Sequence, residues 1–137
     1  MVYTSKSRRP IDQNSIREIL AGAQALNARD EITGFLTARA DHFLQVLEGS
    51  EESVRSCFAR ISLDRRHTLV TVRGEARAES RIFPDWKMGW VEETCPSNST
   101  ESIFNLFESA NRGKAQIEPT SIEAMLRIFS KNAKIVD

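Results

Sequence analysis

The stretch HFLQVLEG, residues 42–49, constrains the fold more than any other part of the chain. Its side chains alternate as in a β-strand, and Phe43 and Leu47 flank Gln45 on one side. Leu44 and Val46 occupy the other side. Because a strand with apolar side chains on both faces has to be covered on both faces, the sequence predicts a sheet with a layer of structure packed on each side.

The rest of the sequence supplies further strands and two helices around this strand. Periodicity and turn residues give the order β-α-β-β-α-β-β, which indicates an α+β, ferredoxin-like sandwich with two helices on one sheet face. In the last strand we expect Trp86, Met88 and Trp90 to point to the same side. The expected elements are a strand at 1–5, a helix at about 12–28, a hairpin of 32–38 and 42–49, a helix at roughly 50–63, a strand from 68, and a strand at 83–91.

Two amphipathic segments in the C-terminal part are expected to form helices that cover the other sheet face, or that bind a partner. A chain of 137 residues is long enough for one hydrophobic core. We therefore expect one main domain at 1–92 and a two-helix extension at 93–137. The apolar residues of the two segments are Ile103, Phe104, Leu106 and Phe107, then Ile122, Met125, Leu126 and Phe129, separated by Gly113 and Pro119.

Composition argues against several classes of function. Nineteen basic residues balance nineteen acidic ones, so no overall field favours nucleic acid or an anionic membrane. No apolar run approaches the roughly 20 residues that cross a bilayer, and the polar start lacks a signal-peptide core, so a cytoplasmic location is expected. Cys57 and Cys95 suit reduced thiols, and with only His42 and His67 as imidazoles no structural metal site is expected.

Gln45 departs from the pattern, because it is the one polar residue in the apolar run 43–47. A buried amide without partners costs about 1–3 kcal/mol, so Gln45 is expected to have polar groups within reach. The ordinary interpretation is a glutamine satisfied by its neighbours. Tyr3, the single tyrosine, lies on a strand expected to run beside the strand of Gln45, so its phenol could donate to the amide. Asn27 ends the apolar stripe of the first helix, as a cap or a ligand contact. Trp86 and Met88 are equally compatible with an ordinary core.

Five segments together resemble a known family. They are VYTS at residues 2–5, NARDEITGFL at 27–36, FLQVLEG at 43–49, DRRH at 64–67 and RIFPDWKMGW at 81–90. In this order and at these distances they resemble the motifs of BLUF domains, the blue-light sensors that bind flavin. The resemblance covers residues 1 to about 92, and the tail is similar to the extension of short, stand-alone BLUF proteins.

The resemblance implies a flavin ring between the two helices, on the inner side of the sheet. It implies that Gln45 is the amide that responds to light, that Tyr3 is its phenolic partner, and that Asn27 holds the carbonyl and imide edge of the flavin. Family members have more residues ahead of the tyrosine, so Tyr3 is expected to be frayed. The resemblance further assigns Ser5, Trp86 and Met88 to modulation of the amide, and Arg29, Ile32, Arg66 and His67 to flavin contacts. For the arginines a solvated surface is an equal alternative.

The cofactor implied is FAD, with FMN or riboflavin as alternatives. The resemblance implies a sensor without catalytic activity, whose output goes through a protein effector or through homo-oligomer assembly. Two other functions stay open on the same sandwich. One is a small phosphatase-like enzyme, although SKSRRP at residues 5–10 offers no glycine-rich phosphate loop. The other is a flavin-free interaction module whose tail helices dimerise.

Overall fold

A computed structural model of the chain describes residues 1–92 and 116–132. The expected helix around Phe104 and the second cysteine, Cys95, lie outside these residues. The predicted boundary between 92 and 93 falls where the first described segment ends, and it stays a prediction. The elements are β1 (Val2–Ser7), α1 (Gln13–Asp30), β2 (Thr33–Arg39), β3 (His42–Glu48), α2 (Glu51–Ser62), β4 (His67–Gly74), β5 (Lys87–Trp90) and α4 (Pro119–Asn132).

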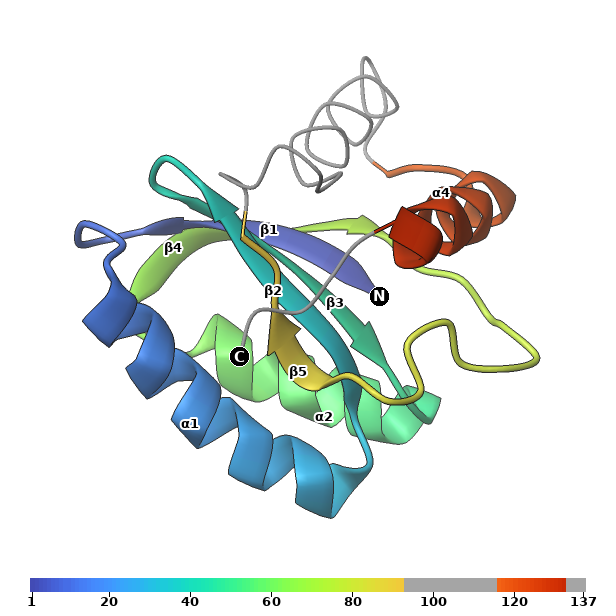
Figure 1. The fold of residues 1–137 in the computed structure, drawn as a ribbon, viewed down its shortest axis with the longest axis horizontal. Helices are drawn as coiled ribbons and strands as arrows, with labels where there is room; N and C mark the ends of the chain where they lie inside the picture. The colour runs from blue at the N-terminus through green and yellow to red at the C-terminus, as the bar shows by residue number, and fades with distance from the viewer. Residues whose placement is uncertain (93–115, 133–137) are drawn as a thin grey trace.

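The strands form one mixed sheet in the order β4-β1-β3-β2-β5. β1 pairs antiparallel with both β3 and β4, the β2–β3 hairpin is antiparallel, and β5 joins β2 in parallel. Helices α1 and α2 cover one face of the sheet, and α4 lies on the other (Figure 1). The predicted α+β, ferredoxin-like sandwich is therefore confirmed, with α4 as the part of its second cover that the structure describes.

Capping contacts mark both ends of α1 and the start of α2. α1 begins with a capping box, in which the Ser15 amide donates to Asp12 Oδ1 (2.7 Å) and the Asp12 amide donates to Ser15 Oγ (3.0 Å). It ends where Glu31 adopts the left-handed conformation. Ser50 caps α2 by accepting from the amide of Ser53 (3.1 Å).

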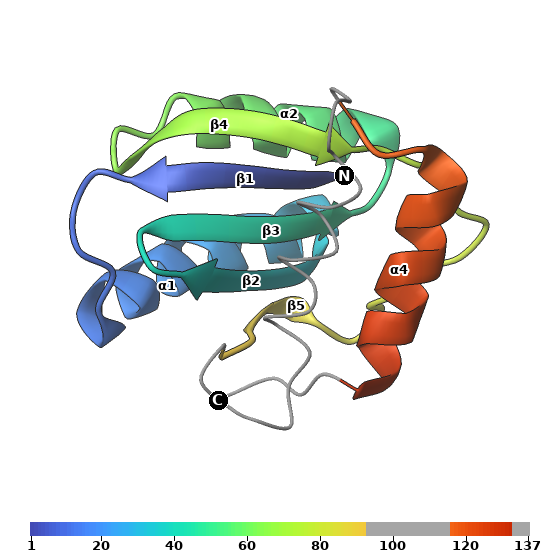
Figure 2. The same cartoon turned by 90° about the horizontal axis from the view of Figure 1, so that it is seen from above.

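The alternation along β3 divides the interior into two cores. Phe43 and Leu47 pack under α1 and α2, whereas Leu44 and Val46 pack on the opposite side, as expected. Helix α4 crosses that second side near the start of β1 (Figure 2), where the ring of Phe129 stacks on Phe35 with centroids 4.8 Å apart. Apolar side chains on both faces of β3 therefore have the two-sided cover that their pattern requires.

The last strand differs from its prediction. β5 is shorter than residues 83–91, because Phe83 to Trp86 form a turn before it. Met88 is an extra residue in the pairing with β2 and has a left-handed backbone, with φ 71°. The expectation that Trp86 points the same way as Met88 is wrong: Trp86 packs in the α4 core, and Met88 with Trp90 in the other.

Within residues 1–92 and 116–132, none of the helices combines the length and the apolar character needed to span a bilayer.

Candidate functional site

A cavity of about 220 Å³ lies between α1, α2 and the sheet face that these helices cover. β1, β2 and β3 form its floor, and the segment that connects α2 to β4 closes one end. Much of the wall is apolar, and a few polar side chains converge on it, which is typical of a small-molecule site. The lining residues are Tyr3, Ser5, Ile19, Gly22, Ala23, Leu26, Asn27, Leu36, Phe43, Gln45, Cys57, Arg60, Ile61, Asp64, Arg66 and His67.

Tyr3 and Gln45 form a hydrogen-bonded pair on the floor of the cavity. They lie opposite each other in the β1–β3 register, and the phenol of Tyr3 donates to Gln45 Oε1. Gln45 Nε2 donates in turn to Met88 Sδ (3.0 Å). Both side chains of the pair are only 4% exposed, so the predicted fraying of Tyr3 is wrong: its strand is paired on both sides. Burial raises the pKa of Tyr3, which keeps the phenol neutral and able to donate.

Asn27 enters the cavity from the last turn of α1. Its main-chain carbonyl accepts from the amide of Ile32 (2.8 Å), which ties the end of the helix to the start of β2. Its side chain is 3% exposed, and Oδ1 accepts from the Cys57 thiol, with Sγ and Oδ1 3.7 Å apart. Nδ2 is buried and has no hydrogen-bond partner among the described residues. This wall of the cavity therefore presents a donor that requires an acceptor.

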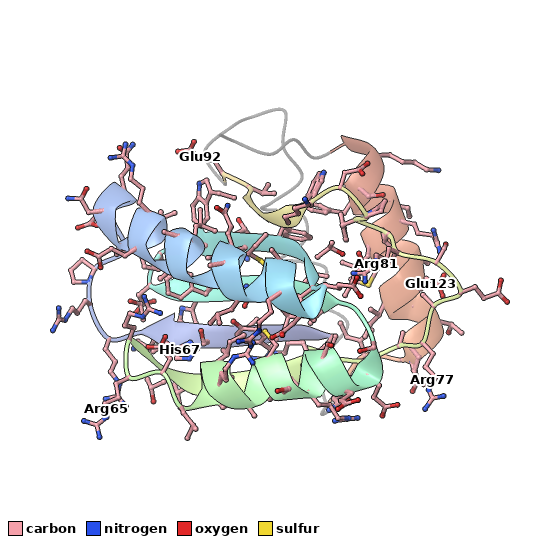
Figure 3. All side chains as sticks on the ribbon, turned by 90° about the horizontal axis from the view of Figure 1, so that it is seen from below. Arg65, His67, Arg77, Arg81, Glu92 and Glu123 are labelled. Atoms are coloured by element: carbon pink, nitrogen blue, oxygen red, sulfur yellow. The ribbon has the colours of Figure 1, made fainter. Side chains whose placement is uncertain are left out.

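Ser5 and His67 form a second polar link at the floor. His67 Nε2 lies 2.6 Å from the carbonyl oxygen of Ile61, and Nδ1 lies 2.9 Å from Ser5 Oγ. Because a carbonyl oxygen can only accept, the neutral ring carries its proton on Nε2, and the Ser5 hydroxyl donates to Nδ1. Figure 3 shows His67 at the sheet, whereas its neighbour Arg65 points outward. Ser5 is 1% exposed, so its hydroxyl orientation is fixed by this contact.

Three ion pairs lie at or near the edge of the cavity. Arg60 donates to Asp30 Oδ2 (2.9 Å) across the α1–α2 gap, and Asp30 also accepts from Arg29. The hydrogen bond from Arg29 holds the pKa of Asp30 below its usual range. Arg66 likewise hydrogen-bonds Asp64 and lowers the pKa of that carboxyl. The rim thus carries three guanidinium groups and two carboxylates, on α1, α2 and the α2–β4 connection.

The structure gathers most, but not all, of the predicted site residues. Tyr3, Ser5, Asn27, Gln45, Arg66 and His67 line the cavity, and Met88 joins them through Gln45. Besides Met88, three predicted residues do not line it. Arg29 is an exposed partner of Asp30, Ile32 is a core residue beneath the helices, and Trp86 contacts Phe35 and Phe83 in the other core. What each of these residues does stays a prediction.

Sequence reasoning missed three polar lining residues: Cys57, Arg60 and Asp64. Cys57 belongs to the predicted inner stripe of α2, and Arg60 follows three residues later, on the same face of the helix. That spacing was the available signal for Arg60.

The lining residues suit a mainly apolar ligand that offers a carbonyl oxygen at its edge. The unpaired Asn27 Nδ2 requires such an acceptor, and the Gln45 amide on the floor can both donate and accept. The isoalloxazine ring of a flavin has this character.

Comparisons with known proteins identify the family and the fold of the chain. The family model described as "BLUF: Sensors of blue-light using FAD" matches residues 1–89. Photoactivated adenylate cyclase subunit beta of Euglena gracilis is 34% identical over 89 residues, which are 64% of this chain and 10% of that protein. The chain thus spans about a tenth of the length of this curated relative.

Solved structures give the same fold over most of both chains. The dark-state structure of BlrB, a BLUF protein, has a TM-score of 0.74 and 25% identity, and the match covers 95% of this chain and 92% of that one. The photo-activated state of BlsA also has a TM-score of 0.74, at 22% identity, over 99% of this chain and 96% of the other. At that identity the second match supports the fold alone.

Proposed function

The chain belongs to the BLUF family, whose members are sensors of blue light that use FAD, and we propose that it senses light through the buried Tyr3–Gln45 pair. The family match favours this function over the phosphatase-like enzyme and the flavin-free module. We further propose that the chain itself has no catalytic activity and that FAD, rather than FMN or riboflavin, is the bound form.

The proposed binding mode follows from the polar groups on the cavity wall. Asn27 Nδ2 donates to a flavin carbonyl, which gives this buried donor its partner. Gln45 faces the ring from the sheet, and Leu26 and Ile19 of α1 shield one side of it. Arg66 and His67, at the end of the cavity, are the proposed contacts of the flavin rim. Arg29 and Ile32 do not line the cavity, so any effect they have on the flavin goes through their neighbours.

The proposed light response uses the chemistry of an amide. When bound, flavin supplies absorption of blue light and an excited state that takes up an electron and a proton. Tyr3 is placed to release both, since its phenol already donates to Gln45 Oε1 and stays neutral by burial. Return of both the electron and the proton to Tyr3 would restore the phenol and leave the Gln45 amide rearranged, with its oxygen and nitrogen exchanged. Tyr3 then has to accept instead of donate, and Met88 Sδ loses its donor.

The hydrogen bond from Tyr3 to Gln45 at the cavity floor is the observation that carries this proposal. We expect the purified protein to be yellow and to show a small, reversible red shift of the flavin band under blue light. Gln45→Leu should keep the yellow colour and lose the red shift. Phe43→Leu, on the same wall of the cavity but without an amide, is the matched control and should keep it. A normal red shift in Gln45→Leu would refute the assigned role.

We propose that the signal leaves the cavity through β5. Met88 contacts Gln45 in one core, while Trp86 and Val91, on either side of β5, pack in the core that contains α4. Loss of the Gln45–Met88 contact would therefore change the position of β5, a strand that packs in one core while the residues on either side of it pack in the other. Hydrogen exchange of the α4 amides, compared between dark and illuminated samples, tests this route. We expect weaker protection in the light, and equal protection would contradict the proposal.

We propose that the output passes to a protein effector. The relative from Euglena gracilis, a photoactivated adenylate cyclase subunit, is a case in which light controls an enzyme activity. The homo-oligomer implied by the family resemblance also stays a proposal. Sizing of the flavin-loaded protein in the dark and in the light would detect a change in assembly.

A further inference from the structure

The thiol of Cys57 contacts the side-chain amide of Asn27, whose buried Nδ2 donor lacks an acceptor among the described residues. Cys57 lies on the inner stripe of α2 and is 4% exposed. Its Sγ is 3.7 Å from Asn27 Oδ1, and the contact joins α2 to the end of α1 across the cavity. Burial raises the pKa of the thiol, so it keeps its proton and can donate.

The surroundings of Cys57 decide which way its S–H points. Arg60, one turn further along α2, lines the same cavity, and its positive charge acts on the thiol. A guanidinium has donors only, so it favours the lone pairs of the sulfur, and the S–H is left for an acceptor. Asn27 Oδ1 is that acceptor, and Asp30 holds Arg60 in place through an ion pair of 2.9 Å.

The contact sets the orientation of the Asn27 amide. With Oδ1 occupied by the thiol, Nδ2 is the end of this lining residue that is left for a ligand, and it is buried and unpaired among the described residues. In the reversed orientation Nδ2 would lie against the thiol, and Oδ1 would enter the cavity without a donor. It would then oppose any carbonyl oxygen of a ligand, which is unfavourable because two acceptors would meet.

We propose that Cys57 is a positioning residue, whose thiol locks the Asn27 side chain with its nitrogen toward the cavity and so selects a ligand with a carbonyl oxygen at that position. The inference rests on the proposed flavin function and adds a determinant of ligand orientation to it. No light-driven step is assigned to the thiol.

Cys57→Ser and Cys57→Ala form a matched pair, because both shorten the contact side chain by a similar volume and only serine keeps a donor. The flavin-loaded proteins are compared in the dark by infrared spectroscopy of the flavin carbonyl bands. We expect Cys57→Ser to keep the wild-type band positions. Cys57→Ala should shift the band of the carbonyl bound by Asn27 to higher frequency, because the amide is then free to reverse.

Flavin affinity provides a second measurement. Cys57→Ala should bind FAD about 2- to 10-fold more weakly than Cys57→Ser, the range expected for losing one orientation-setting hydrogen bond. A purely structural role for Cys57 would change both variants alike, since both leave the same gap in the packing. Equal affinities and equal carbonyl bands in the two variants would overturn the inference.

The S–H stretching band tests the contact without reference to the flavin. Its loss in Cys57→Ala identifies the Cys57 band, and Asn27→Leu should move that band to higher frequency by removing the acceptor. An unmoved band would overturn the inference even if flavin binds normally. A wild-type protein that takes up no flavin would instead overturn the proposed function, and the ligand preference inferred here with it.

Discussion

A double-mutant cycle measures the contact between Tyr3 and Gln45. In Gln45→Leu the buried Tyr3 hydroxyl loses its acceptor, and in Tyr3→Phe the buried amide oxygen loses its donor. Each single change leaves one buried group unpaired, which costs about 1–3 kcal/mol of unfolding free energy. The double variant replaces both partners by apolar groups and adds no second penalty. We expect the sum of the losses of unfolding free energy in the two single variants to exceed the loss in the double variant by about 1–2 kcal/mol.

Urea unfolding followed by circular dichroism, in the dark and at one fixed excess of FAD, supplies the four free energies. FAD affinity is measured separately for each variant, so that the stabilisation due to binding can be subtracted. Thr37→Val, a buried change on the opposite side of the sheet, serves as a control partner for Tyr3→Phe. That pair should be additive. Additivity of the Tyr3 and Gln45 changes within about 0.5 kcal/mol would refute the claim that these two groups satisfy each other.

Two further predictions concern Tyr3 and α4. Because burial raises the pKa of Tyr3, its contribution to stability is fully present below the unfolded-state pKa of about 10 and is lost as the pH rises above it, by about 1.4 kcal/mol per pH unit. The free energy of unfolding, measured with urea between pH 9 and about 11, should therefore fall more steeply with pH for wild type than for Tyr3→Phe. Parallel curves for the two proteins would contradict this. Gly74→Ala should weaken the packing of α4, since a Cβ at Gly74 would lie 1.6 Å from Ile122 Cδ1, and overpacking costs about 1–3 kcal/mol. Relief of that cost by adding Ile122→Ala checks the cause, and a Gly74→Ala protein with unchanged stability would show that Ile122 turns aside freely.

Sequence reasoning predicted those parts of the fold that depend on regular periodicity. The alternation from Leu44 to Leu47 predicted that β3 is covered on both faces, because successive side chains of a strand point to opposite faces and here both sets are apolar. The neighbourhood of Tyr3 and Gln45 followed from the order of the elements, which places the first strand beside β3.

It failed where the backbone departs from regular geometry. The bulge at Met88 inserts one residue into β5 and breaks the alternation that had placed Trp86 beside Met88. No local sequence signal predicts the bulge, because a left-handed backbone is usually adopted by glycine or asparagine and here is adopted by methionine. Arg29 shows another limit: the family resemblance assigns it to the flavin rim, but it follows the lining residue Asn27 by two positions, which do not share a face of a helix. Its guanidinium pairs with Asp30 and is exposed.

The same bulge gives β5 a physical reason to respond to a small change at Gln45. A methionine with φ 71° is held in an unfavourable conformation that costs roughly 1 kcal/mol, so neighbouring contacts have to maintain it. Two such contacts are present: Gln45 Nε2 donates to its sulfur, and Gln24 Nε2 of α1 donates to its carbonyl oxygen (3.3 Å). A reversal of the Gln45 amide removes the first contact and leaves the second. The strain at Met88 and the net value of one hydrogen bond are of similar size, about 1 kcal/mol each. Losing that contact is therefore enough to shift Met88 from the left-handed conformation toward a relaxed one. The neighbouring Trp86 packs against Phe35 and Phe83, whose rings contact Phe129 of α4, so a relaxation of the bulge would reach the second core within two layers of side chains.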